Sequence, residues 1–130
     1  MSPDREAAWN LLNEFVKNPN LVNHGVAAEA AMRRYARDLG HADEEEKWAI
    51  TGLIHDFDWE IYPSAPDHAV KGAQILQERG YPADIIRAVV AHADWSGVPR
   101  ETPMEHALNA VDELSGFVVA VALVRPSRKL

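Results

Sequence analysis

Six histidine and aspartate side chains, spread over most of the chain, have the types and spacing to bind metal ions. They are His24, His55, Asp56, His68, His92 and Asp112. Imidazole nitrogen and carboxylate oxygen are ligands of divalent iron, manganese and zinc, and carboxylates also bind magnesium. A metal ion held in this way can activate water as a nucleophile. The six residues therefore predict a centre for one or two metal ions, with the adjacent pair His55-Asp56 in its middle.

The composition narrows the choice of cofactor and partner. The chain of 130 residues has no cysteine, which excludes disulfides and thiolate ligands. The cofactors expected are thus one or two divalent ions of iron, manganese, magnesium or zinc. The formal net charge is −7, and lysine and arginine form no continuous stripe, so we expect no nucleic acid polymer as a partner. A nucleotide in a metal-lined pocket is not disfavoured by this charge.

The spacing of apolar residues predicts an all-α fold. Helices are expected over about residues 3–16, 21–38, 43–56, 68–79, 82–92 and 103–124. No segment shows the alternating pattern of a half-buried strand. With 47% apolar and 25% charged residues, the composition is that of a soluble globular protein, and the length suits one domain.

Several of these helices have recognisable ends. Ser2 and Pro3 suggest the N-cap and first position of the first helix. Gly40 and Gly80 each follow the last periodic residue of a helix and are expected to end it. The segment Thr102–Glu105 has the pattern of a capping box with proline at the first helical position.

The helical period also predicts which side chains point inward. On the second helix we expect an inward face made of Val22, Val26, Ala30 and Tyr35. On the fifth helix, Ile85, Val89 and His92 share one face, and Leu108 and Asp112 share a face of the last helix. An unpaired carboxylate in the interior costs several kcal/mol, roughly, so Asp112 needs a partner. That partner is a metal ion, an arginine or a histidine.

The ordered ligands on successive helices make the chain resemble the HD-domain superfamily of metal-dependent phosphohydrolases. The segments GLIHDFDWE, DHAVKGAQIL and ALNAVDEL also match, and the resemblance covers about Leu21 to Pro126. It implies an HD-domain helical bundle of about six helices with the metal site at its centre. We expect one such domain over residues 1–130, without the C-terminal helices of longer relatives.

The resemblance also implies roles for the six ligands. One ion takes the positions of His24, His55, Asp56 and Asp112. Binuclear relatives add the positions of His68 and His92, and Asp56 then bridges the two ions. Many relatives carry glycine where this chain has Asp58, and some carry lysine where it has Trp59. This difference argues against the cyclic-dinucleotide subgroup.

The function implied is hydrolysis of a phosphate ester or anhydride by metal-activated water. Two divalent ions would leave the site with a net charge of about +2, which favours a phosphate. The partner expected is a small phosphorylated molecule such as a nucleotide. Asp56 and Asp58 are the candidate catalytic residues, although Asp58 could equally be a loop carboxylate in solvent. Lys71 is the candidate substrate-binding residue, with a solvated helix face as its alternative.

Two other functions use the same ligands. One is a di-iron oxygenase of the HD type, and the other is a non-catalytic regulatory module that keeps a structural metal.

Residues 117–124 are apolar on every side, and a helix of this kind must be covered all round. We therefore expect that this helix is buried in a homo-oligomer interface, or that the chain is a shortened version of a longer relative. No signal peptide or membrane span is expected, and the location predicted is cytoplasmic.

Overall fold

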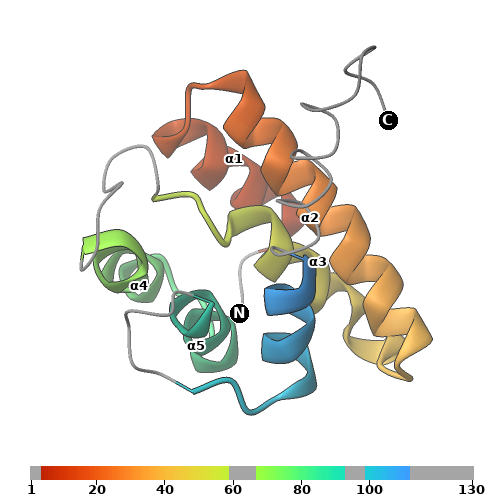
Figure 1. The fold of residues 1–130 in the computed structure, drawn as a ribbon. Coiled ribbons are helices and arrows are strands. Elements are labelled where there is room, and N and C mark those ends of the chain that lie inside the picture. The colour runs from red at the N-terminus through yellow and green to blue at the C-terminus, as the bar shows by residue number, and fades with distance from the viewer. Residues whose placement is uncertain (1–3, 59–66, 93–98, 112–130) are drawn as a thin grey trace, which may run out of the picture.

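The computed structural model of the protein describes residues 4–58, 67–92 and 99–111, without the side chains of residues 67–70 (Figure 1). The helices are α1 (Arg5–Phe15), α2 (Pro19–Asp38), the short 3₁₀ helix η1 (Ala42–Glu44), α3 (Glu45–Ile54), α4 (Asp67–Glu78), α5 (Ala83–Ala91) and a further helix over residues 103–111. The described part of the chain contains no strand, so the predicted all-α class is confirmed. None of its helices is both long and apolar enough to cross a membrane.

Helix α3 lies in the middle of the molecule (Figure 1). Every residue from Trp48 to Ile54 is buried. Such a helix must be covered on all sides, because it has no polar face to give to water. Helix α2 packs along α3 over the longest contact, and α1 and α5 also pack against it. The last residues of α3 therefore emerge in the interior of the bundle, where His55 follows.

Two clusters of buried apolar side chains form the core. The first joins α1, the C-terminal half of α3, α4 and α5, and includes Leu12, Leu53, Phe57, Leu76 and Val89. The second joins α2, the start of α3, α5 and the 103–111 helix, and includes Met32, Trp48, Ala88, Met104 and Leu108. Because α3 and α5 contribute to both clusters, their relative position is fixed from two sides.

The predicted helix ends are partly confirmed. Gly40 and Gly80 have φ values of +83° and +85°, the left-handed conformation that glycine adopts without strain after a helix. The prediction for α1 was wrong. This helix begins at Arg5, and Asp4 is its N-cap, because Asp4 Oδ1 accepts the Ala7 N–H at 2.9 Å. A carboxylate also suits the positive end of the helix dipole.

The capping box is confirmed and does more than cap. Thr102 Oγ1 accepts the Glu105 N–H at 3.1 Å, and Glu105 Oε1 accepts the backbone N–H groups of Glu101 and Thr102. The other oxygen, Oε2, lies 3.2 Å from Nε of Arg87 on α5. Arg87 also donates to the Pro99 carbonyl at 2.9 Å. The buried Glu105 carboxylate thus holds the start of the 103–111 helix against α5.

The inward face predicted for α2 was also wrong in part. Val26 and Ala30 are exposed, whereas Val22 and Tyr35 are partly buried. The residues of α2 that are buried are Gly25, Ala28, Glu29, Met32 and Ala36. Small residues on this face let the α2 backbone approach α3 closely.

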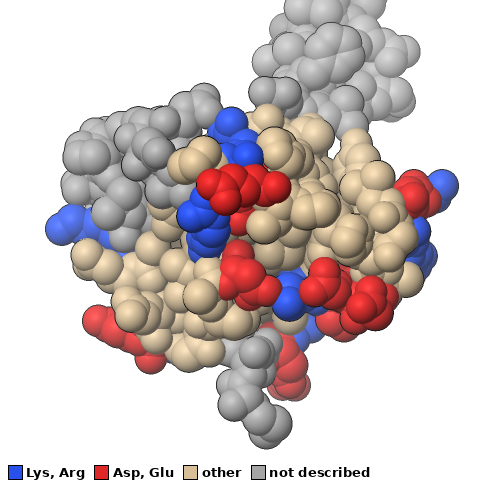
Figure 2. All heavy atoms as spheres, turned by 90° about the horizontal axis from the view of Figure 1, so that it is seen from below, with Lys and Arg blue, Asp and Glu red and all other residues tan. Residues whose placement is uncertain are grey.

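Glu29 is buried because arginine compensates its charge. Arg5 donates to both of its carboxylate oxygens, at 2.8 and 3.0 Å. The ion pairs continue from Arg33 and Arg37 on α2 to Glu45 at the start of α3. These hydrogen bonds, with that from Arg37 the largest, lower the pKa of Glu45 to about 2. Figure 2 shows acidic and basic side chains lying next to one another on the face it draws.

Candidate metal centre

The turn that follows α3 carries the His-Asp pair into the interior. His55 keeps helical backbone angles as the C-cap residue of α3, and its side chain is fully buried. Its Nδ1 lies 2.6 Å from the carbonyl oxygen of Gly52. A carbonyl only accepts, so Nδ1 carries the proton and a neutral ring keeps the lone pair on Nε2. The backbone of α3 therefore orients His55 with its Nε2 available as a metal ligand.

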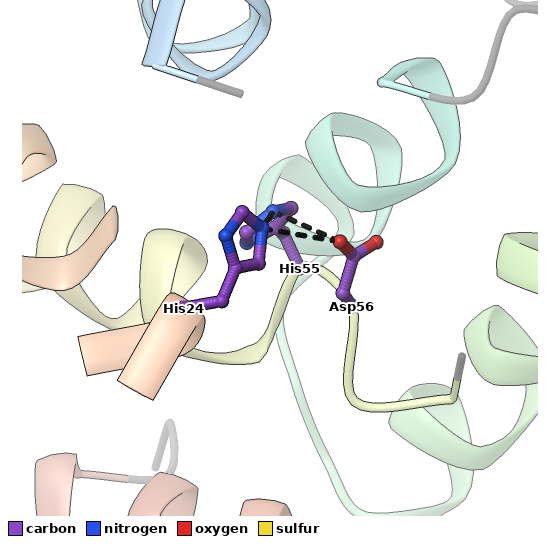
Figure 3. Close-up of side chains that lie close together, drawn as sticks. All are labelled: His24, His55 and Asp56. Atoms are coloured by element: carbon purple, nitrogen blue, oxygen red, sulfur yellow. Dashed lines mark hydrogen bonds and ion pairs between the residues drawn. The ribbon is translucent and has the colours of Figure 1, made fainter. Parts of the chain in front are cut away.

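Helix α2 brings His24 to the same point, as Figure 3 shows. His24 Nε2 lies 3.2 Å from His55 Nε2. Asp56 Oδ2 lies 3.3 Å from each of these nitrogens. One ligand atom from each of the three residues thus falls within a group no wider than 4.8 Å, a size that suits a single metal ion.

Two glycines set the distance between the helices that carry these histidines. A Cβ added to Gly25, the neighbour of His24, would lie 2.7 Å from the carbonyl oxygen of Leu53. A Cβ added to Gly52 would lie 2.6 Å from the carbonyl oxygen of Ala28. Both are well inside the van der Waals limit, so α2 and α3 pack backbone to backbone here. These glycines were not singled out in the sequence, although glycine inside an otherwise helical pattern is a signal of close packing.

The other oxygen of Asp56 faces a different histidine. His92, at the end of α5, places Nε2 3.0 Å from Asp56 Oδ1. Its Nδ1 donates to the carbonyl of Val89, so the lone pair of the neutral ring is again on Nε2. Asp56 Oδ2 therefore faces His24 and His55, and Oδ1 faces His92, whose ring centroid lies 5.2 Å from that of His55.

The donor set fits a divalent cation. Imidazole nitrogens with lone pairs and an ionised carboxylate are all electron donors, and packing them together is favourable when a cation lies among them. The side chains of His55 and His92 are 0% and 5% exposed, which holds them in place. Those of His24 and Asp56 are 26% and 25% exposed, so the centre is open to solvent on that side.

The remaining predicted site residues have different outcomes. Position 68 is helical, but the side chain of His68 and all of Asp112 lie outside the described residues. Lys71 is exposed on α4, and its contact with a substrate stays a prediction. Asp58 is fully buried, so the alternative of a loop carboxylate in solvent was wrong. The structure thus brings His24, His55, Asp56 and His92 together.

Fold and site together define an all-α protein with a histidine–aspartate centre suited to divalent metal. Residues 21–117 match the HD domain family, and the chain belongs to this family. HD domains bind divalent metal ions, and the family is one of metal-dependent phosphohydrolases. The predicted family is therefore confirmed.

Among curated proteins, the chain is similar to Ribonuclease Y of Oleidesulfovibrio alaskensis and of two strains of Nitratidesulfovibrio vulgaris. Each is 31% identical over 98 residues, which is 75% of this chain and 18% of the relative. The chain therefore spans less than a fifth of the length of these relatives. No solved structure matches the chain significantly.

Proposed function

We propose that the protein is a metal-dependent phosphohydrolase that acts on a small phosphorylated molecule such as a nucleotide. The observation that carries this proposal is the position of Asp56, whose Oδ2 lies near the nitrogens of His24 and His55 and whose Oδ1 lies near that of His92. A divalent ion held there would activate water and offset negative charge on a phosphoryl group. The location proposed is cytoplasmic.

Each residue of the centre has a distinct part in this proposal. His24, His55 and Asp56 Oδ2 hold the first ion, and Asp112 completes its ligands. His92 and Asp56 Oδ1 hold the second ion, together with His68. The backbone carbonyls of Gly52 and Val89 fix the ring orientations of His55 and His92. Solvent access beside His24 and Asp56 gives a substrate phosphate and the attacking water a path to the centre.

The name of the relatives supports a second candidate substrate, RNA. Their name suggests the phosphodiester bond of RNA as the bond to test. Its hydrolysis belongs to the same class of reaction as hydrolysis of a small phosphate ester. The net charge of −7 argues against a long polymer, because binding to a phosphate backbone depends on clustered lysine and arginine. A short oligonucleotide or a nucleotide is therefore the substrate that we favour.

Elemental analysis of protein purified without added metal, followed by hydrolysis assays with Mn²⁺, tests the proposal. The substrates are nucleoside mono- and diphosphates, dinucleotides and short RNA. We expect His55→Ala to lose the first ion and all hydrolysis, because it removes a ligand that is fully buried. His92→Ala should keep the first ion. His106→Ala is the matched control, since His106 is exposed on the 103–111 helix.

Other results would point elsewhere. Stoichiometric metal in His55→Ala would contradict the ligand assignment. Two irons per chain with consumption of oxygen would favour a di-iron oxygenase. Tight metal retention and a large loss of stability on chelation, without turnover of any substrate, would favour a regulatory module.

A further inference from the structure

Asp58 and Gly72 form a close contact between the turn after α3 and the middle of α4. Asp58 comes two residues after Asp56 and is fully buried. A Cβ added to Gly72 would lie 2.7 Å from Asp58 Cγ and closer still to its Oδ2. Any residue larger than glycine at position 72 would therefore displace the carboxylate or the helix.

Glycine at this position opposes the local preference of the chain. Gly72 lies inside α4, where glycine costs about 1 kcal/mol relative to alanine in helix propensity. It is also buried, unlike the exposed Gly80 that ends the helix. The contact with Asp58 supplies the physical reason, because only a residue without a side chain leaves space for the carboxylate.

The contact fixes α4 at a point that matters for the metal centre. Elsewhere α4 packs on α5, and it enters the first core cluster through Leu76. Leu76 lies toward the C-terminal end of α4. Gly72 contacts the turn that carries His55 and Asp56 closer to the start of α4, and position 68 precedes Gly72 by four residues, about one helical turn.

We propose that Asp58 is a positioning residue, whose buried carboxylate packs against Gly72 and holds the N-terminal half of α4 at a fixed distance from Asp56. The effect on metal rests on the proposed function, in which α4 supplies His68 to the second ion. Asp58 then acts on the second ion through the helix, without touching it. The direct catalytic role predicted for Asp58 is replaced by this one in the proposal.

Three variants, Gly72→Ala, Asp58→Ala and the double variant, test the proposal in the full chain. Gly72→Ala should weaken binding of the second Mn²⁺ by ~10- to 100-fold in titration calorimetry, as loss of support for metal ligands typically does. It should leave the first ion less affected. In the double variant the new methyl group occupies the space of the lost carboxylate, so binding should recover in part. Gln74→Ala, at an exposed position of α4, is the control.

The melting temperatures of the metal-free variants test the positioning role of Asp58 separately from the proposed metal-dependent function. If the wild type binds no Mn²⁺, the proposed function fails, yet Gly72→Ala should still melt below the wild type and the double variant above Gly72→Ala. A double variant no better than Gly72→Ala in either measurement would overturn the positioning role. So would equal weakening of both ions, which indicates general loss of structure. If Gly72→Ala does not fold, a folded double variant supports the contact and an unfolded one refutes it.

Discussion

Asp56 differs from other carboxylates of the protein in the kind of group that its oxygens face. The buried carboxylates of Glu29 and Glu105 lie against arginines, Arg5 and Arg87, which compensate their charge within the protein. The two oxygens of Asp56 lie against imidazole nitrogens. Arginine pairs stabilise structure, whereas a carboxylate among imidazoles is the pattern of a metal site. The groups that contact each carboxylate therefore distinguish the carboxylates that stabilise the fold from the carboxylate that is placed to bind metal.

Glu45 allows a test of the carboxylates that pair with arginine. Its folded pKa of about 2 lies below the ordinary value of 4.5, owing to Arg37 and Arg33. Its contribution to stability is therefore complete above pH ~4.5 and is lost as the pH falls toward about 2. Glu45→Gln should melt at a lower temperature than the wild type at pH 7, and the difference should shrink below pH ~4.5. A difference independent of pH would be inconsistent with this pairing, and Asp43→Asn at a nearby exposed position serves as control.

At the scale of the helices, the sequence predicts ends better than faces. The capping box at Thr102 and Glu105 and the glycines after α2 and α4 were found because each signal is local. The inward face of α2 was misjudged because Val26 and Ala30 were expected inside, and Gly25 was not considered. Gly25 is buried instead, since it permits close packing on α3. The burial of Gly25 depends on how α2 and α3 pack together, so it cannot be predicted from the sequence of α2 alone.

The close packing of α2 on α3 makes Gly25→Ala an informative change. The added methyl group would lie 2.7 Å from the Leu53 carbonyl oxygen. Overpacking costs roughly 1–3 kcal/mol, and the gain in helix propensity of about 1 kcal/mol offsets part of it. We expect a modest loss of stability and, because His24 moves away from His55, weaker binding of the first ion. Denaturant unfolding and metal titration measure the two effects.

The control for this variant is Asn23→Ala, which changes an exposed position of α2 next to His24. Asn23→Ala should leave the free energy of unfolding and the affinity for the first ion near those of the wild type. Unchanged metal affinity in Gly25→Ala would show that the spacing of α2 and α3 does not set the donor distance.

At the scale of the whole molecule, the meeting of four of the six predicted ligands could be foreseen from the sequence, but their geometry could not. The order of His24, His55, Asp56 and His92 on successive helices indicated a shared site, and these four side chains do meet. Which oxygen of Asp56 faces which histidine depends on packing between residues 24, 56 and 92. His68 and Asp112 remain predicted ligands. The single domain over residues 1–130 and the oligomer through residues 117–124 also remain predictions.

Metal binding should stabilise the whole fold. The candidate ligands come from α2, the turn after α3 and α5, so an ion bound by the native state is released on unfolding. At a free metal concentration 100 times the dissociation constant, the stabilisation is ~2.7 kcal/mol per site. We expect the melting temperature to rise with Mn²⁺ and to fall again with a chelator. His55→Ala should lose the part of this response that the first ion supplies, and a response equal to that of the wild type would place the stabilising ion elsewhere.

Oδ2 of Asp56 faces His24 and His55 and Oδ1 faces His92, and this division has a consequence for how the protein is made. His24 lies on α2, and His55 and Asp56 directly follow α3, so all three are synthesised before α5. His92 comes 36 residues after Asp56. On a ribosome the chain emerges N-terminus first. His24, His55 and Asp56 can therefore meet while α5 is still being synthesised, whereas Asp112, the proposed fourth ligand of the first ion, is made only after α5.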